Sequence, residues 1–257
     1  MSHLLITGAS SGLGAALALA YAKTDCRLTL HGRDVAWLTS VAAQARALGA
    51  EVTTACGDVT DTAAMKIWIG SVDTKHPIDL VIANAGISAG TGHGEESPEQ
   101  SRSIFDVNLT GVLNTIHPIL PLMKSRGDGQ IAIVSSLAGF RGIAGAPSYC
   151  ASKAAVRVYG EPLRGHMAAH GVKVNVVCPG FITTPMTARN RFPMPFIMSA
   201  ERASRIIQKG LNTNRPRIAF PWMMYLAVRL LDALPQSLVD RLMASTPRKQ
   251  SLTGDMG

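Results

Sequence analysis

A serine, a tyrosine and a lysine in the middle of the chain have the chemistry needed to move a proton to or from a carbonyl oxygen. Tyr149 and Lys153 are four residues apart, so a helix would place both on one face. Ser136 precedes Tyr149 by 13 positions and follows an apolar run, residues 131–134, that predicts a buried strand. A Tyr and a Lys at this spacing also occur by chance, so the assignment depends on the elements around them.

A glycine-rich turn near the N-terminus predicts a site for a phosphate group. The apolar residues 3–7 predict a strand, Gly8, Gly12 and Gly14 follow it, and an Ala- and Leu-rich stretch to residue 23 predicts a helix. Glycines let the backbone approach a ligand closely, and the unpaired N–H groups of a helix N-terminus attract phosphate. A plain turn between a strand and a helix is the alternative, but the strand–turn–helix context favours a nucleotide site.

The ends of the next two predicted strands bear on the kind of nucleotide. After residues 27–31, Arg33 is the first side chain that can reach an adenosine ribose. A guanidinium pairs well with a 2′-phosphate, which favours NADP over NAD. The neighbouring Asp34 is better explained as a helix N-cap. Asp58, which follows the strand at residues 51–55, either bonds the adenine amino group or caps the next helix.

Strands and helices alternate along most of the chain, which predicts an α/β fold with one parallel, doubly wound, Rossmann-like sheet. A chain of 257 residues fits one such domain, residues 1–257. The remaining strands are predicted at residues 78–82 and 172–178, and the helices at residues 35–48, 62–72, 98–123, 147–170, 200–211, 222–231 and 238–243. Ligands of such sheets bind at the carboxyl ends of the strands.

Two further features lie at that edge. Small residues, Asn84, Ala85 and Gly86, follow the fourth strand, where a cofactor would lie over the sheet. Asn108 lies in the middle of the helix predicted at residues 98–123, a position that Asn disfavours, which indicates a function for it.

Taken together, these motifs resemble the short-chain dehydrogenase/reductase family in its shorter, single-domain form, over residues 3–186 and more weakly beyond. The resemblance identifies Asn108, Ser136, Tyr149 and Lys153 as the catalytic residues. In addition to Arg33, which the end of the second strand already suggests, the resemblance implies nucleotide contacts from Gly8, Ser10, Ser11, Gly12, Leu13, Gly14, Asp58, Val59, Asn84, Ala85, Gly86, Tyr149, Lys153, Pro179, Gly180, Ile182 and Thr184.

The implied reaction is the interconversion of a carbonyl and a secondary alcohol with NADP(H). Tyr149 exchanges the proton, and Lys153 lowers the tyrosine pKa and bonds the nicotinamide ribose. Ser136 holds the substrate oxygen, and Asn108 supports a water that connects Lys153 to solvent. Reduction of a carbonyl is the favoured direction.

Two departures from the family pattern are present. Ala83 replaces an Asn, and Ser11 replaces a basic residue found in many NADP users, so phosphate selectivity depends on Arg33. The alternatives are an NAD-preferring alcohol dehydrogenase and a non-catalytic, NADP-sensing protein on the same fold. The intact set of Ser136, Tyr149, Lys153 and Asn108 argues against the second.

The cysteines and the apolar runs bear on localisation. The 4 cysteines, Cys26, Cys56, Cys150 and Cys178, have no disulfide or metal-ligand spacing, which predicts free buried thiols, a reducing compartment such as the cytoplasm, and no metal site. The N-terminus has no signal-peptide pattern, and no apolar run approaches the ~20 residues that span a bilayer.

The positive charge is concentrated in the C-terminal quarter. Residues 1–188 hold 14 Lys and Arg against 13 Asp and Glu, whereas residues 189–257 hold 11 against 4. By resemblance, residues 186–199 form a helical substrate lid. Its apolar content favours an acyl, isoprenoid or steroid-like substrate, or the side chains simply pack the lid.

A C-terminal extension is predicted at residues 212–257. Within it, residues 218–231 are apolar with one charge, and basic and aromatic residues flank them. This pattern suits an interfacial anchor at the inner face of a membrane. The favoured alternative is a helix packed on the domain or on another subunit, because the family commonly forms homo-dimers and homo-tetramers. Nucleic-acid binding is not expected, because no motif for it accompanies the basic residues.

Overall fold

The structure is a computed structural model, and it describes residues 1–92, 94–142, 145–190, 192–243 and 251. Within these residues, seven parallel strands form the central sheet in the order β3-β2-β1-β4-β5-β6-β9. They are β1 (Ser2–Thr7), β2 (Cys26–Gly32), β3 (Glu51–Cys56), β4 (Leu80–Ala83), β5 (Gly129–Val134), β6 (Val172–Pro179) and β9 (Arg217–Phe220). The strand order runs outward from β1 in both directions, so a crevice opens between the carboxyl ends of β1 and β4. The predicted doubly wound, parallel fold is confirmed.

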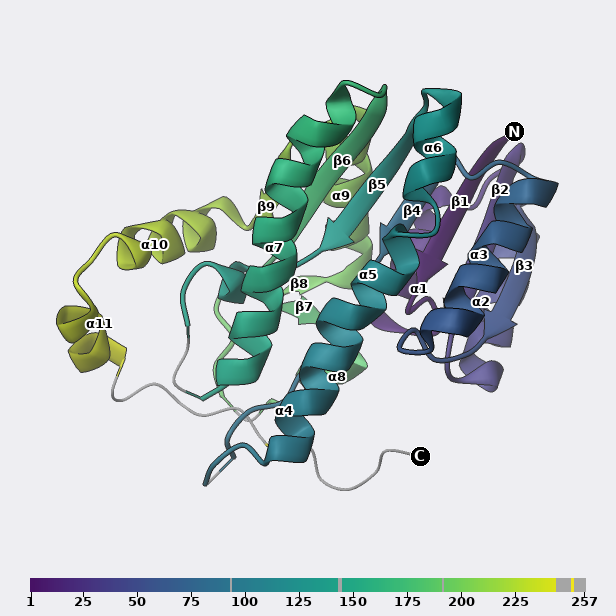
Figure 1. The fold of residues 1–257 in the computed structure, drawn as a ribbon. Coiled ribbons are helices and arrows are strands. Elements are labelled where there is room, and N and C mark those ends of the chain that lie inside the picture. The colour runs from purple at the N-terminus through teal and green to yellow at the C-terminus, as the bar shows by residue number, and fades with distance from the viewer. Residues whose placement is uncertain (93, 143–144, 191, 244–250, 252–257) are drawn as a thin grey trace.

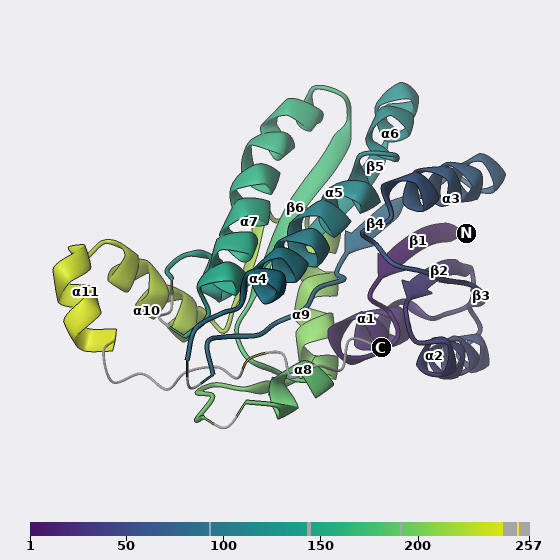
Figure 2. The same cartoon turned by 60° about the horizontal axis from the view of Figure 1, so that its bottom comes forward.

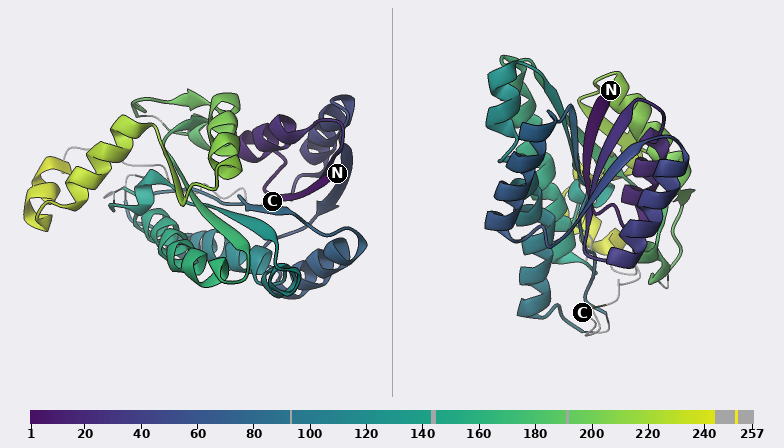
Figure 3. Two further views of the ribbon diagram at one scale, coloured as in Figure 1. Left: turned by 90° about the horizontal axis from the view of Figure 1, so that it is seen from above. Right: turned by 90° about the vertical axis from the view of Figure 1, so that its right-hand side faces the viewer.

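Helices cover both faces of the sheet, as the side view in Figure 3 shows. One face carries α1 (Gly12–Tyr21), α2 (Val35–Ala47) and α9 (Ala200–Asn212). The other carries α3 (Thr62–Lys75), α4 (Pro98–Phe105), α5 (Gly111–Ile116), α6 (Leu120–Arg126) and α7 (Pro147–Ala168). Successive residues of β1 point to opposite faces, so Leu4 and Ile6 join one buried cluster and Leu5 joins the other. Burial on both sides explains why the central strands β1, β4 and β5 are rich in apolar residues, whereas the edge strand β3 is largely exposed.

The continuous helix predicted at residues 98–123 is wrong. The chain forms α4, then a π-helical segment, η1 (Asp106–Thr110), then α5, and it turns again before α6. Pro118 lies in that second turn, and its missing N–H cannot continue a helix. Asn108 lies in η1, and π segments of this kind are frequent at functional sites.

Strand β9 at the edge of the sheet is absent from the sequence prediction. Pro216 and Pro221 flank its four residues, and proline on both sides weakens the signal for a strand. Its burial nevertheless alternates, with Ile218 and Phe220 inside, which is the pattern of a half-buried strand.

The lid predicted at residues 186–199 contains little helix. The short strands β7 (Ile182–Thr183) and β8 (Met198–Ser199) pair with each other, and α8 (Pro185–Ala188) is the helix of this region within the described residues. The prediction of buried cysteines is confirmed for Cys26, Cys150 and Cys178 and wrong for Cys56, which ends the edge strand β3 and is exposed.

Two helices, α10 (Trp222–Asp232) and α11 (Gln236–Met243), extend away from the sheet (Figures 1 and 2). The inner face of α10 packs on the domain through Met224, Tyr225 and Val228. Its outer face exposes apolar side chains, with Trp222 69% exposed and Leu230 62% exposed. In the described part of the chain, no helix has the length and apolar character needed to cross a membrane. Residues 244–250 and 252–257 of the predicted extension lie outside the described residues.

Candidate active site

The glycine-rich turn between β1 and α1 requires its glycines. Gly8 and Gly12 have φ of +66° and +55°, in the left-handed region that side chains disfavour. A Cβ on Gly14 would lie 2.0 Å from the carbonyl oxygen of Gly8, which is not a possible contact. The turn therefore leaves an open cradle of backbone at the N-terminus of α1, as a phosphate site needs.

Asn84 braces this turn from the end of β4. Its side-chain amide donates to the carbonyl oxygens of Thr7, at 3.0 Å, and Gly8, at 3.1 Å. The Thr7 hydroxyl accepts from the backbone N–H groups of Asn84 and Ala85. The β4 end thus holds the glycine turn in place without the Asn that Ala83 replaces.

Arg33 and Asp58 lie at the β2–β3 end of the pocket. Asp34 caps α2 by accepting from the N–H of Trp37, as predicted. Asp61 caps α3, so Asp58 is not the helix cap and its carboxylate accepts instead from the N–H of Thr60, at 2.8 Å.

The surroundings of Asp58 favour the charged form of its carboxyl group. Burial raises the pKa of this carboxyl, but hydrogen bonds from Thr60 and the positive fields of Arg33 and His31 outweigh it and leave the pKa below its usual value. A carboxylate and a guanidinium therefore line the same end of the pocket, where the sequence predicts the adenosine half of a nucleotide.

Ser136, Tyr149 and Lys153 come together at the carboxyl end of β5. Ser136 lies just after that strand and begins the 3₁₀ turn η2 (Leu137–Gly139), where its hydroxyl accepts from the N–H of Ala138. Tyr149 and Lys153 share one face of α7, and the lysine is only 5% exposed. The Lys153 ammonium donates to the carbonyl oxygen of Val134, at 3.1 Å, and the Ser135 hydroxyl donates to the carbonyl oxygen of Lys153.

Burial and two serines act in opposite directions on the pKa of Tyr149. Burial raises the pKa of the phenol above its ordinary value, and the nearby Cys150 adds to this. Hydrogen bonds with the Ser136 and Ser88 side chains act in the opposite direction. The lowering of this pKa by Lys153, expected from sequence, remains a prediction. Ser88 opens the polar loop after β4, and no motif marks it.

Asn108 lies behind the pocket wall and is fully buried. Its carbonyl oxygen accepts from the N–H of Ile87, at 2.8 Å, and its amide donates to the Ile87 carbonyl oxygen and to the Ser152 hydroxyl. Asn108 therefore joins the loop after β4 to α7, and its support of a water remains a prediction.

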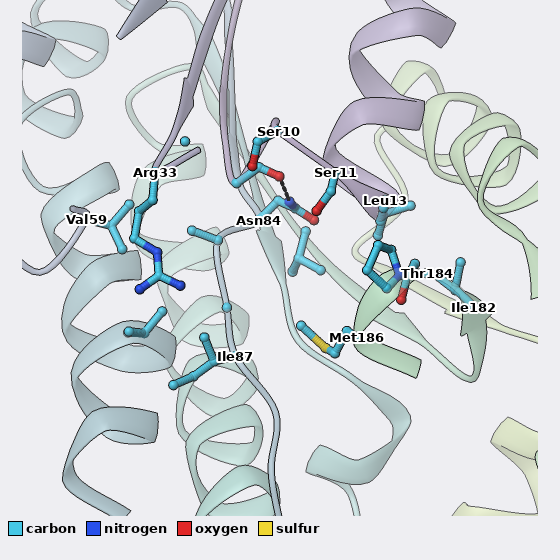
Figure 4. Close-up of a pocket in the computed structure, with 18 of the residues that line it drawn as sticks. Ser10, Ser11, Leu13, Arg33, Val59, Asn84, Ile87, Ile182, Thr184 and Met186 are labelled. Carbon is cyan, nitrogen blue, oxygen red and sulfur yellow. Dashed lines mark hydrogen bonds between the residues drawn. The ribbon is translucent and has the colours of Figure 1, made fainter. Parts of the chain in front are cut away.

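One pocket of about 320 Å³ joins the two halves of the site. Every predicted nucleotide-contact residue lines it except Gly14, which lies beneath the turn. Figure 4 shows Arg33 and Val59 on one side of this pocket and Ile182, Thr184 and Met186 on the other. His31, Ile87 and Ser135 also line it, and the sequence does not predict them, because their types are ordinary for a strand end or for the loop after β4. In the part of the chain that the structure describes, no group of three or more His, Cys, Asp or Glu could hold a metal ion.

The fold and this pocket define a class of α/β oxidoreductases that use a dinucleotide. The family model of short chain dehydrogenases matches residues 2–193. The chain belongs to the short-chain dehydrogenase/reductase family, as the motifs predict.

Comparison with known proteins agrees with this assignment. An uncharacterized oxidoreductase of Myxococcus xanthus (strain DK1622) is 40% identical over 238 residues, 92% of this chain and 94% of the relative. A short-chain dehydrogenase from Sphingobium yanoikuyae in complex with NADPH has a TM-score of 0.77 at 26% identity, covering 92% of this chain and 98% of that chain. A family member from Burkholderia phymatum in complex with NAD has a TM-score of 0.82 at 24% identity, covering 96% of each chain, which shows the fold alone.

Proposed function

We propose that the protein is an NADP(H)-dependent reductase that interconverts a carbonyl and a secondary alcohol, with Tyr149 as the general acid–base. The observation that supports it most is the hydrogen bond between Tyr149 and Ser136, beside the buried Lys153 and in the same pocket as the glycine turn. Because burial raises the pKa of Tyr149, the phenol is protonated near neutral pH. A protonated phenol is the form that can donate a proton to a carbonyl oxygen, which supports the reductive direction.

The residues present fit a nicotinamide nucleotide. The open backbone cradle at Gly8, Gly12 and the N-terminus of α1 would hold the diphosphate, and Arg33 would hold a 2′-phosphate. Asp58 would face the adenine, and the ribose and nicotinamide would contact the residues around Lys153 and Gly180. When bound, the nucleotide supplies or accepts the hydride.

The protein's own residues would orient the substrate oxygen and give it a proton. The Ser136 hydroxyl would donate a hydrogen bond to the carbonyl oxygen and orient it toward Tyr149. Tyr149 would give its proton to that oxygen as negative charge develops there. The Lys153 ammonium, close behind, would stabilise the tyrosinate that remains, and Asn108 would keep the loop after β4 against α7.

An apolar substrate is proposed from the walls on the lid side. Ile87 and Met186 line the pocket, and Phe196 and Ile197 are exposed in the lid. The test is an NADPH-oxidation panel over ketones that range from small sugars to long-chain acyl and steroid carbonyls, repeated with NADH. We expect turnover of the apolar ketones with NADPH and none of the sugars. Turnover of sugars alone would contradict the substrate class, and the absence of any NADPH- or NADH-linked turnover would contradict the function.

The exposed face of α10 supports a homo-oligomer more than a membrane contact. This face is apolar, but α10 carries one Arg and one Asp, so it offers no net positive charge to anionic lipids. The nearby Arg217 is already paired with Glu161. We therefore propose that a second copy of the chain covers Leu226 and Leu230.

Replacing Leu226 with Asp should dissociate this oligomer, because it would place a charge in an apolar interface. Light scattering after size-exclusion chromatography would measure the mass of wild type and variant. The matched control is Leu48→Asp, a similarly exposed leucine next to α2, which should leave the mass unchanged. A monomeric wild type that sediments with anionic vesicles would instead favour the membrane contact.

A further inference from the structure

We propose that Arg157 is a positioning residue that docks the Ser136 turn onto the Tyr149 helix and thereby sets the distance between the two hydroxyls. The proposal rests on the proposed acid–base function of Tyr149. It concerns a side chain that lies outside the pocket and matches no motif of the sequence.

Arg157 continues the row of chemically active side chains along α7. Tyr149, Lys153, Arg157 and Glu161 follow one another at intervals of four residues, so they lie along one side of the helix. The first two face the pocket, and the next two lie beyond it. The Arg157 guanidinium approaches both carboxylate oxygens of Glu161, at 3.3 Å each. Its side chain is 16% exposed, so the arginine is largely removed from solvent.

The Arg157 guanidinium contacts the end of the turn that Ser136 begins. Its Nε donates to the carbonyl oxygen of Gly139, at 3.1 Å, and its carbon lies 4.4 Å from the centre of the Phe140 ring. The N–H of Gly139 in turn donates to the carbonyl oxygen of Ser136, at 3.0 Å. Two hydrogen bonds therefore connect Arg157 to the residue that holds the Tyr149 phenol.

Packing already restrains the turn on its other sides, so loss of the Arg157 contact is the change that could let it shift. A Cβ on Gly139 would lie 2.8 Å from the backbone of Lys153, so the turn already packs directly on α7. The Phe140 ring is also contacted by the guanidiniums of Arg217, at 5.2 Å, and Arg229, at 5.9 Å, and by the Tyr225 ring, at 5.4 Å. Of the side chains that contact the Phe140 ring, Arg157 also donates a hydrogen bond to the turn backbone, at the Gly139 carbonyl oxygen.

Loss of the Arg157 contact should therefore change the pKa of Tyr149, because it would weaken the hydrogen bond between Ser136 and the phenol. Ser136, Ser88 and Cys150 influence the pKa of the Tyr149 phenol, Lys153 lies on the same helix face, and the hydrogen bond of Ser136 lowers this pKa more than that of Ser88 does. If the turn shifts, that bond lengthens and the pKa of Tyr149 rises further. The pH limb that depends on Tyr149 then moves to higher pH in both directions of the reaction, because reduction needs the phenol and oxidation needs the tyrosinate.

The experiment compares Arg157→Met with wild type. Methionine keeps an unbranched apolar side chain and removes the bond to Gly139, while Glu161 keeps its pairing with Arg217 and is not left as an isolated charge. We expect kcat to fall by about 10- to 100-fold, as small misplacements of reacting groups commonly cause, with KM for NADPH unchanged. Arg157→Lys, which keeps the charge, should restore only part of the loss, because an ammonium lacks the planar fork.

Two readouts separate positioning from general destabilisation. The first is the pH profile of kcat. The second is a spectrophotometric tyrosinate titration of the nucleotide-free protein, with Tyr149→Phe subtracted. The matched control is Arg164→Met, which removes another arginine of α7, whose guanidinium donates to Val174 at 2.6 Å and to Asn214 at 2.8 Å, away from the pocket.

The control should lose thermal stability and keep both the kcat and the Tyr149 titration of wild type. A folded Arg157→Met with a wild-type kcat, or with an unmoved Tyr149 titration, would overturn the positioning role. Neither of those results touches the proposed function, which fails separately if Tyr149→Phe keeps its activity.

Discussion

Replacing Tyr149 with Phe is expected to lower kcat by a factor of about 10² to 10⁴, the usual contribution of a positioned acid–base group. The substitution removes one oxygen atom and leaves the ring, so the packing of α7 against the turn after β5 should persist. Binding of NADPH, followed by its fluorescence, should stay close to wild type, because the glycine turn, Arg33 and Asp58 are untouched. The loss therefore belongs to kcat and not to the nucleotide Kd.

A second tyrosine of the same helix provides the control. Tyr159 bonds His117 at 3.0 Å on the outer side of α7 and does not line the pocket. Tyr159→Phe should keep wild-type kcat and KM, and Ser136→Ala should lie between the two variants, because it removes the bond to the substrate oxygen but not the proton. A Tyr149→Phe protein that retains most of its activity would show that the proton comes from another group.

The residues that sequence alone could identify are those whose roles depend on short spacing. The glycine turn and the Tyr149–Lys153 pair lie within single strand–turn–helix or helix units, so local geometry brings them together. Poor helix propensity singles out Asn108, yet the pattern around it predicts one continuous helix. The π segment there accompanies bonds from Asn108 to Ile87, 21 residues away. No local propensity contains that information.

Contacts between elements that are distant in the chain could not be predicted from the sequence. Ser88 and Arg157 act through contacts with the Ser136 turn and the Tyr149 phenol, and both contacts form only when separate elements pack. Strand β9 exists because β6 offers it an edge, and its own four residues carry too weak a pattern between two prolines. The hydrogen bonds of Ser136 and Ser88, which act against the effect of burial on the pKa of Tyr149, likewise form only in the folded protein, and the lowering of this pKa by Lys153 remains a prediction.

On the proposed function, Arg33 selects NADP over NAD, and removing its side chain should measure that selectivity. In Arg33→Ala, the Kd for NADPH should rise by about 10- to 150-fold, which corresponds to the ~1.5–3 kcal/mol of a hydrogen bond to a charged group. The Kd for NADH should change little, because NADH carries no 2′-phosphate. Fluorescence titration of both nucleotides with the same protein gives the two constants directly, and NADH acts as the internal standard for folding.

The geometry makes this effect specific to one side chain. Within the described residues, Arg33 forms no salt bridge, and its field contributes to the low pKa of Asp58. Arg46→Ala is the matched control, since Arg46 lies on the neighbouring α2, donates to the carbonyl oxygen of Val52 and does not line the pocket. If Arg33→Ala kept the wild-type ratio of the NADPH and NADH constants, recognition of a 2′-phosphate by Arg33 would be excluded. Because Ser11 stands where many NADP users carry a basic residue, the glycine turn offers no second cation there that could hide the loss.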